Sequence, residues 1–292
     1  MINFELKYNH LLNVFNGYLE QKFDNLDNLA PETIRDAMKY AIVDGGKRVR
    51  PVLCLSFAQA FNVPIEQMLE FALAIECIHS YSLVHDDLPC MDNDDFRRGK
   101  LSTHKKFGEA IGVLTGDALL NFAFEVCLSK DNMTINDINA VKIIAELAGY
   151  RGMVAGQVLD LENERSNNFS EEILYKIFDN KTAKLILAPI MVVSCFIDEK
   201  YVSSLKEFGY NLGILFQITD DILDVEGNVE TIGKTPNKDS AVDKLTSVKI
   251  LGLDGAKARA KFHFENCLEA LSNVPNNEFL IAFTEKTYNR KK

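Results

Sequence analysis

The sequence predicts a single all-α domain, on three observations. Apolar residues recur at helical spacing through almost the whole chain, and the alternating pattern typical of strands is scarce. No linker rich in Pro, Gly or Ser divides the chain, and no internal repeat interrupts it. Hydrophobic residues make up 47% of the chain, enough to bury a sizeable core. We therefore expect one helical bundle that covers residues 1–292.

Ten helices are predicted from the periodic segments and the residues that break them. Pro51 suits the first turn of the third helix, and Pro89 ends the fourth because it disfavours a helical conformation at Leu88. The predicted helices cover residues 5–23, 32–43, 51–61, 65–86, 107–129, 136–161, 171–196, 200–226, 240–271 and 277–289.

Small and polar residues within the later helices need an explanation. Gly108, Gly112 and Gly116 are four residues apart, and we interpret them as a surface for close helix packing. Gln157 and Asp160 share a helix face, so as a buried pair they need hydrogen-bond partners. The polar segment 179–184 is either an ordinary break or a source of a cation and a hydroxyl for a phosphate.

Composition and charge restrict the function. The chain has 32 basic and 42 acidic residues, a formal charge of −10, which argues against non-specific binding to nucleic acid or anionic membranes. Six cysteines are scattered singly, without zinc-site or disulfide spacing, as expected of reduced thiols in the cytoplasm. Residues 1–10 lack a secretory signal. The longest apolar run, residues 185–197, is too short to span a bilayer, so we expect no membrane span.

The first functional signal is an aspartate-rich stretch over residues 85–100. It places five carboxylates within ten residues, directly before Arg97 and Arg98. Such carboxylates repel one another unless a cation or strong donors neutralise them. Asp86 is expected at a helix end, and the following loop can fold Asp92 back to share a metal. The alternative is a solvated acidic turn.

A second aspartate cluster follows more than a hundred residues later, within residues 216–224. Asp220 and Asp224 are four residues apart, so they lie on one face of the predicted helix. If the two clusters converge, they form an oxygen-lined site that suits Mg²⁺ together with a phosphate ester.

Basic segments supply candidate anion sites. Gly45 and Gly46 free the backbone before a helix start, where amides can face an anion together with Lys47 and Arg50; a turn with solvated basic residues is the alternative. In the loop after the second cluster, Lys234, Lys238 and Lys244 could close over a polyanion. The basic carboxyl end, residues 288–292, is either a solvated tail, which we favour, or a flap on the same site.

Taken together, these motifs resemble those of the trans-isoprenyl diphosphate synthases, most closely the bacterial-type farnesyl diphosphate synthases. Residues 45–51 are similar to GGKRxRP, and residues 86–99 to the longer bacterial form of DDxxxxD followed by RRG. Residues 156–160 are similar to GQxxD, 181–182 to KT, and 217–224 to the second DDxxD motif with its preceding Gln. The matches occur in order and span nearly the whole chain.

The resemblance implies the isoprenoid synthase fold, a helical bundle around a central pocket, and commonly a homodimer. It implies Lys181, Thr182 and Gln217 as catalytic residues. It implies that isopentenyl diphosphate is bound by Gly46, Lys47, Arg50, His79 and Arg98. It implies that the allylic diphosphate is bound by Arg97, Lys181, Thr182, Gln217, Lys234 and Lys244. It implies three Mg²⁺ ions per site, held by Asp86, Asp87, Asp92, Asp220, Asp221 and Asp224.

The implied reaction is head-to-tail condensation of isopentenyl diphosphate with dimethylallyl and then geranyl diphosphate. In the family, a bulky aromatic residue five positions before the first aspartate forms the pocket floor; Tyr81 occupies this position, next to Ser82. A fifteen-carbon farnesyl product is therefore expected, with a twenty-carbon geranylgeranyl product as the alternative.

The chain departs from the family pattern at Ala155, Ala183, Leu101 and Ser247. None of these removes a metal ligand or a diphosphate-binding cation, so they affect kinetics and local packing more than the reaction.

Three other classes of protein remain open. A terpene cyclase shares the fold but normally has an Asn/Ser/Glu pattern in its second motif. His79 with His85 and Asp86 suggests a histidine–aspartate phosphohydrolase, which leaves the second cluster unexplained; a lone His79 is also often only a hydrogen-bonded structural group. A regulatory subunit of a heteromer normally loses aspartates that this chain keeps. Turnover by the purified chain discriminates among them.

Overall fold

A computed structural model describes residues 3–43, 45–166, 170–226 and 245–290, and these are almost entirely helical. The α-helices are α1 (Phe4–Asp24), α2 (Glu32–Ile42), α3 (Val49–Ala60), α4 (Ile65–Asp86), α5 (Thr103–Phe107), α6 (Glu109–Leu128), α7 (Ile135–Ala148), α8 (Met153–Ser166), α9 (Glu171–Ile177), α10 (Lys184–Ser194), α11 (Val202–Glu226), α14 (Ser247–Leu271) and α15 (Glu278–Tyr288). A π-helical segment, η1 (Phe178–Ala183), and a 3₁₀ turn, η2 (Glu199–Tyr201), complete the helices. This confirms the predicted all-α class.

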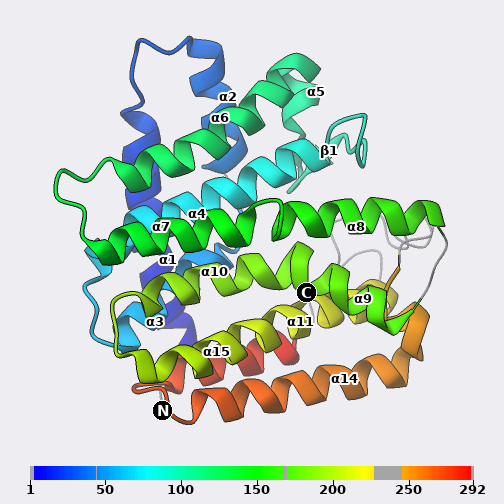
Figure 1. Cartoon of the computed structure of the whole chain (residues 1–292). Helices are drawn as coiled ribbons and strands as arrows, with labels where there is room; N and C mark the ends of the chain where they lie inside the picture. The colour runs from blue at the N-terminus through cyan, green and yellow to red at the C-terminus, as the bar shows by residue number, and fades with distance from the viewer. Residues whose placement is uncertain (1–2, 44, 167–169, 227–244, 291–292) are drawn as a thin grey trace.

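The helices pack in layers around one main core. In Figure 1, α7 and α8 run nearly in line across the molecule, with α4 and α6 on one side and α10, α11 and α14 on the other. Helix α4 lies deepest, with apolar side chains buried on most sides. Because α4 ends in the first aspartate motif, this largely buried helix carries one of the two predicted metal-binding groups.

Two predicted helices are each divided where the backbone changes direction. The prediction of one helix over 136–161 was wrong, because α7 ends at Ala148 and α8 begins at Met153. Between them the Gly152 amide donates a hydrogen bond to the Gly149 carbonyl at 2.9 Å, which forms a turn. The prediction over 171–196 missed that α9 passes into the π-helical segment η1 before α10. A π-helical turn contains an extra residue, and periodicity alone does not reveal it.

The predicted packing role of the glycines holds for two of the three. Gly108 lies between α5 and α6 with φ +93°, so it separates two helices instead of belonging to one. A Cβ on Gly112 would lie 3.0 Å from the His104 side chain, and one on Gly116 would lie 2.0 Å from the His85 ring. Gly112 and Gly116 therefore allow α6 to approach its neighbours closely.

A short hairpin follows the first aspartate motif and was not predicted. Strand β1 (Phe96–Arg97) pairs antiparallel with β2 (Lys100–Leu101). Arg98 and Gly99 form the two-residue turn with φ values of 54° and 77°, as a tight turn matching the strand twist requires. The hairpin holds the two arginines in defined positions at the end of α4.

Helix α6 bears on the prediction that no segment spans a membrane. By length and composition it is the one helix among the described residues that could cross a membrane. Three carboxylates, Glu109, Asp117 and Glu125, lie along it, and it packs against α2, α4 and α5. A core helix of a globular domain passes the same test, and these contacts favour that interpretation. All six cysteines have free thiols, as predicted.

Candidate active site

The first aspartate motif forms where α4 ends. The loop beyond Pro89 folds back so that the Asp92 amide donates a hydrogen bond to the Asp86 carbonyl at 2.8 Å. Burial, opposed by Lys181 and assisted by Asp92, raises the pKa of the Asp86 carboxyl to about 6. A cation beside Asp86 and Asp92 would stabilise the ionised form of the buried Asp86 carboxyl.

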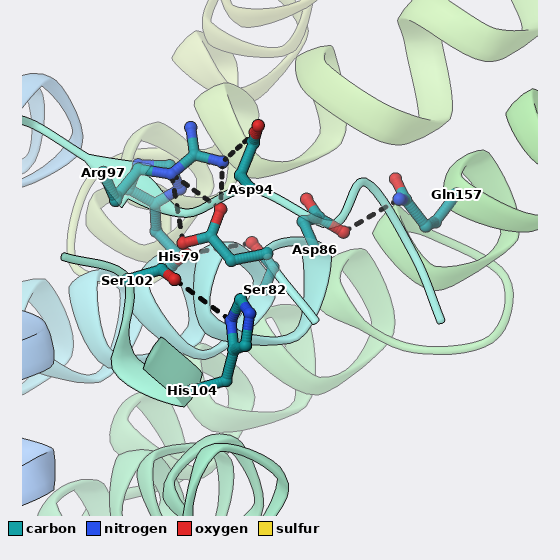
Figure 2. A network of polar contacts seen from close by, with 9 residues as sticks. His79, Ser82, Asp86, Asp94, Arg97, Ser102, His104 and Gln157 are labelled. Carbon is teal, nitrogen blue, oxygen red and sulfur yellow. Dashed lines mark hydrogen bonds and ion pairs between the residues drawn. The ribbon is translucent and has the colours of Figure 1, made fainter. Parts of the chain in front are cut away.

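Asp87, the neighbour of Asp86, has a different environment. Its carboxylate is only 2% exposed and accepts hydrogen bonds from the Arg97 guanidinium, with Nε at 3.0 Å from Oδ1. Arg97 also lies 3.5 Å from Asp94, an ion pair drawn in Figure 2. Asp87 therefore anchors Arg97 on the β-hairpin beside the first motif.

Helix α8 and segment η1 connect to this motif through polar side chains. Gln157 on α8 donates to Asp86 Oδ1 at 2.8 Å (Figure 2). Asp160, one turn further along α8, forms an ion pair with Lys181, in which Oδ2 lies 2.5 Å from Nζ. These contacts confirm the prediction that Gln157 and Asp160 need polar partners.

The π-helical segment η1 packs exceptionally closely on both its neighbours. A Cβ on Gly156 of α8 would lie 2.1 Å from the Lys181 backbone nitrogen, and one on Gly213 of α11 would lie 2.4 Å from Ala183. Gly213 thus leaves the space that Ala183 needs, so the departure at Ala183 is accommodated by its neighbour. Lys181 is consequently directed to α8, while the next residue, Thr182, contacts α11.

Thr182 begins a hydrogen-bonded chain that enters the second aspartate motif. Its hydroxyl donates to Gln217 Oε1 at 2.9 Å, and Gln217 Nε2 donates to Asp221 Oδ1 at 3.1 Å. Asp221 Oδ2 accepts from both the backbone nitrogen and the hydroxyl of Ser247, at 2.6 and 2.8 Å. Segment η1 is therefore linked to the second motif through Thr182 and Gln217. Through Lys181 it also contacts α8, whose Gln157 reaches the first motif.

Asp220 and Asp224 lie on a different side of α11 from Asp221. Both are partly exposed, and Asp220 forms an ion pair with Arg290, just beyond the end of α15. The Arg290 guanidinium also lies 4.6 Å from the centre of the Phe216 ring. The prediction of a solvated basic tail is therefore wrong for Arg290, which reaches the second aspartate motif.

The predicted isopentenyl diphosphate residues converge at the start of α3. Arg98 Nη1 donates to the Gly45 carbonyl at 3.1 Å, and a Cβ on Gly46 would lie 2.9 Å from the Arg98 guanidinium. Burial, together with repulsion from Arg98, lowers the pKa of Arg50 to about 10. Among the described residues, Arg50 Nε has no hydrogen-bond partner although it is buried. An anion would satisfy this group and relieve the repulsion.

His79, on α4, lies close to the same cations. Burial first, and then the positive charges of Arg50 and Arg98, hold its pKa well below the usual value of 6.5. The ring is therefore neutral at physiological pH. A neutral imidazole can donate one hydrogen bond to an anion without adding a charge.

Sequence reasoning missed the groups that hold this basic loop in place. Arg48 has φ 48° and forms a buried ion pair with Glu76 of α4 at 2.9 Å. Its guanidinium also donates to the Val43 carbonyl at 2.8 Å, and Tyr8 of α1 donates its hydroxyl to the Lys47 carbonyl. The sequence signal was a glutamate within an otherwise apolar part of α4, which predicts a buried charge that needs a partner.

Tyr81 lies on α4, five residues or about one and a half turns before Asp86. Its side chain is buried, and its ring meets the His85 ring edge-on with centroids 5.8 Å apart. Burial, and then the charge of Asp86, raises its pKa to about 12. Ser82 donates its hydroxyl to the His79 carbonyl at 2.9 Å, a contact within α4.

Lys234 and Lys244, together with Lys238, lie outside the residues that the structure describes. Among the residues that are described, no three Asp, Glu, His or Cys side chains form a ready-made metal cage. Mg²⁺ prefers one or two carboxylates together with water and phosphate oxygens, so the partly exposed Asp86, Asp92, Asp220 and Asp224 fit this ion in company with a phosphorylated ligand.

Comparison with known proteins agrees with this geometry. The polyprenyl synthetase family model matches residues 31–279. Farnesyl diphosphate synthase from Haemophilus influenzae is 40% identical over 94% of this chain and 95% of its own length. Chloroplastic geranylgeranyl pyrophosphate synthase from Capsicum annuum is 45% identical, over 78% of this chain and 63% of its own length.

Solved structures extend the similarity to the fold. A crystal structure of geranyltransferase from Helicobacter pylori, complexed with magnesium and isoprenyl diphosphate, is 32% identical with a TM-score of 0.81. The match covers 99% of this chain and 97% of that one. On the family model and these relatives, the chain belongs to the polyprenyl synthetase family.

Proposed function

We propose that this protein is a farnesyl diphosphate synthase. It condenses isopentenyl diphosphate head-to-tail with dimethylallyl diphosphate and then with geranyl diphosphate, releasing diphosphate each time. The observation that carries the proposal is the position of η1 between the two motifs. Lys181 pairs with Asp160 of α8, the helix whose Gln157 contacts Asp86, and Thr182 contacts Gln217 before the second motif. The alternative functions, a terpene cyclase, a phosphohydrolase or a regulatory subunit, each fail to explain part of this arrangement.

Mg²⁺ would be held by Asp86 and Asp92 of the first motif and by Asp220 and Asp224 of the second, with three ions per site. Magnesium supplies positive charge that stabilises the departing diphosphate. Two observations support this assignment: a cation would stabilise the ionised form of Asp86, whose pKa is raised by burial, and Asp220 already pairs with a positively charged group, Arg290. Asp87 is buried against Arg97 and serves to position that arginine.

The allylic diphosphate is bound beside these aspartates by cations of the protein. Arg97 is held by Asp87 and Lys181 by Asp160, so both reach the substrate already oriented. Lys234 and Lys244, outside the described residues, complete the set in this proposal. As negative charge develops on the leaving oxygen, these groups stabilise it, and the allylic C–O bond ionises.

Isopentenyl diphosphate is bound at the start of α3. Lys47, Arg50 and Arg98 bind its phosphates, the Gly46 backbone approaches closely, and neutral His79 donates a hydrogen bond. The unpartnered Arg50 Nε supports this assignment. The substrate's double bond then attacks the allylic cation, and the released diphosphate accepts the proton that is lost.

A fifteen-carbon product is favoured over twenty carbons by two observations. Tyr81 is buried on α4 five residues before Asp86, and in this proposal its ring limits the depth available to the growing chain. The farnesyl diphosphate synthase from Haemophilus influenzae matches along 95% of its length, whereas the geranylgeranyl enzyme from Capsicum annuum matches along 63%.

We further propose a cytoplasmic homodimer in which a second copy covers α6. This helix is apolar along most of its length, yet Val113, Leu114 and Leu128 are exposed on it, next to exposed Ile135 on α7. Light scattering of the purified protein is expected to give twice the chain mass, and Leu114→Glu to shift it to one chain mass. A wild-type monomer would contradict the dimer.

The reaction is tested with purified protein, Mg²⁺, labelled isopentenyl diphosphate and each allylic primer in turn. Chromatography of the dephosphorylated products is expected to give farnesol from both dimethylallyl and geranyl diphosphate. Asp86→Asn is expected to lower kcat by at least about a hundredfold because it removes a carboxylate that orients the metal. Geranylgeraniol as the main product would support the alternative, and absence of any prenyl transfer would contradict the proposal.

A further inference from the structure

The second aspartate motif contains two consecutive aspartates with unlike environments. Consecutive residues on an α-helix point about 100° apart, so Asp220 and Asp221 cannot face the same ligand equally. Asp220 has a side chain that is 46% exposed and contacts Arg290, whereas Asp221 is 6% exposed. The two adjacent carboxylates therefore contact different groups.

The Asp221 carboxylate is bound by protein donors at both oxygens. Oδ2 accepts from the Ser247 backbone nitrogen at 2.6 Å and from its hydroxyl at 2.8 Å, and Oδ1 accepts from Gln217 Nε2 at 3.1 Å. Ser247 is the first residue of α14 and fully buried. Its amide is one of those that a helix N-terminus leaves without an intrahelical partner, and these amides stabilise a negative charge. The α14 N-terminus thus provides the counter-charge that a cation would otherwise provide.

This arrangement fixes the orientation of the Gln217 amide. A carboxylate only accepts hydrogen bonds, so Asp221 requires the NH₂ end of Gln217 on its side. The Gln217 oxygen then faces Thr182, whose hydroxyl donates a hydrogen bond to Gln217 Oε1 at 2.9 Å. The oxygen lone pairs of Thr182 are left for other contacts, which matters if this residue stabilises a nearby carbocation.

The anchor is formed by one residue, Ser247, at the start of α14. A serine hydroxyl and its own backbone nitrogen can both reach one carboxylate oxygen, as they do here. We propose that Asp221 and Ser247 are positioning residues that orient Gln217 and Thr182 for prenyl transfer, and that Asp221 is not a magnesium ligand. This inference rests on the proposed function and revises the role of one aspartate.

The metal-binding part is tested by calorimetric titration of Mg²⁺ into the protein with inorganic diphosphate. Asp221→Asn is compared with Asp224→Asn, a change of the same chemistry one turn away on α11. Asp224→Asn is expected to weaken Mg²⁺ binding at least about tenfold because it removes a ligand, whereas Asp221→Asn leaves it within about twofold. Equal weakening by both variants would show that Asp221 is a ligand and overturn the inference.

The positioning part is tested by steady-state kinetics of prenyl transfer. Ser247→Ala is expected to lower kcat about fivefold with little change in KM, since one oriented hydrogen bond is lost. Ser247→Thr, which keeps the hydroxyl, is expected to retain most of kcat. Ser56→Ala removes another buried serine hydroxyl, which donates to the Leu53 carbonyl within α3, and is the control for general destabilisation. Unchanged kcat in Ser247→Ala would overturn the role of the anchor.

An exchange of donor and acceptor tests the orientation of the amide. In Asp221→Asn the new NH₂ group meets Gln217 Nε2, so the Gln217 amide must turn over and lose its bond from Thr182. Adding Gln217→Glu provides an acceptor again, and the double variant is expected to regain at least about threefold in kcat over Asp221→Asn alone. No recovery would contradict the orientation step. If the wild-type protein transfers no prenyl group at all, the proposed function fails, while the calorimetric comparison still decides the role of Asp221.

Discussion

Arg290, two residues from the end of the chain, forms an ion pair with Asp220 of the second aspartate motif. The guanidinium also lies against the Phe216 ring, and its charge contributes to lowering the pKa of Lys47, after burial. One side chain therefore links the carboxyl end, the predicted metal site and the predicted isopentenyl diphosphate site. If Asp220 binds Mg²⁺ as proposed, Arg290 and the metal ion would compete for the same carboxylate.

Removal of Arg290 should therefore favour the cation. Arg290→Gln is expected to tighten Mg²⁺ binding about threefold in the absence of diphosphate, because a partly exposed ion pair contributes at most about 1 kcal/mol. Calorimetric titration of Mg²⁺ measures the effect. Lys286→Gln, on α15 shortly before Arg290, removes an exposed ion pair with Glu5 of α1 and is the control. Weaker Mg²⁺ binding in Arg290→Gln would show that the two cations do not compete.

Tyr81→Ala should lengthen the product. The ring is buried on α4 five residues before Asp86, and if it limits the depth of the substrate pocket as proposed, its removal would deepen that pocket. The main product is expected to shift from fifteen to twenty carbons or more in the same chromatographic assay. Tyr150→Ala, at a tyrosine that is 79% exposed, is the matched control and should leave the product unchanged. A fifteen-carbon product from Tyr81→Ala would place the floor elsewhere.

Gly156→Ala should separate α8 from η1. Its Cβ would lie 2.1 Å from the Lys181 backbone nitrogen, so one of the two segments must move. We expect a loss of about 2 kcal/mol in the free energy of unfolding and a fall of about a hundredfold in kcat, because Lys181 and Thr182 are displaced together.

The control is Gly17→Ala on the exposed side of α1, where nothing lies within 4 Å of the added Cβ. Alanine is the better helix former, so this variant should gain about 0.5 kcal/mol. Chemical denaturation and the kinetic assay measure both variants. If Gly156→Ala kept wild-type kcat, the close contact between α8 and η1 would have no role in catalysis.

His263 should make the protein less stable in mild acid. Its ring is buried between Asn211 and the Tyr175 hydroxyl, at 2.8 and 3.1 Å. Burial, and then Arg259, lowers its pKa from 6.5 to about 4. Between these values the unfolded chain binds a proton that the folded chain does not. The free energy of unfolding therefore falls by about 3 kcal/mol as the pH drops from 6.5 to 4.

Urea denaturation at several pH values measures this dependence. His263→Gln should be less stable near neutral pH but should lose less stability between pH 6.5 and 4 than the wild type. His10→Gln, at an exposed histidine, should keep the wild-type dependence. An unchanged slope in His263→Gln would assign the acid sensitivity to other groups.

Much of the fold and site was predictable because local chemistry determines it. Helix periodicity identified most elements, and the loop that returns Asp92 to Asp86 followed from Pro89 ending α4. The need of Gln157 and Asp160 for partners followed from two polar residues on one buried face.

What could not be predicted depends on contacts between distant segments. The π-helical segment η1 becomes stable only because Gly156 and Gly213 allow α8 and α11 to approach it. Arg290 and Asp220 are seventy residues apart in sequence, and a basic chain end alone does not reveal which carboxylate it reaches. The hydrogen bonds of Ser247 likewise require that α14 begin beside α11.

The central claim is that the two aspartate motifs together hold magnesium and one diphosphate. A crystal structure with Mn²⁺ and inorganic diphosphate, with anomalous scattering recorded at the manganese edge, tests it most directly. The account predicts anomalous peaks within coordination distance of Asp86 or Asp92 and of Asp220 or Asp224, with the diphosphate bridging them and Arg290 displaced from Asp220. Manganese bound at one motif alone, or at neither, would contradict it.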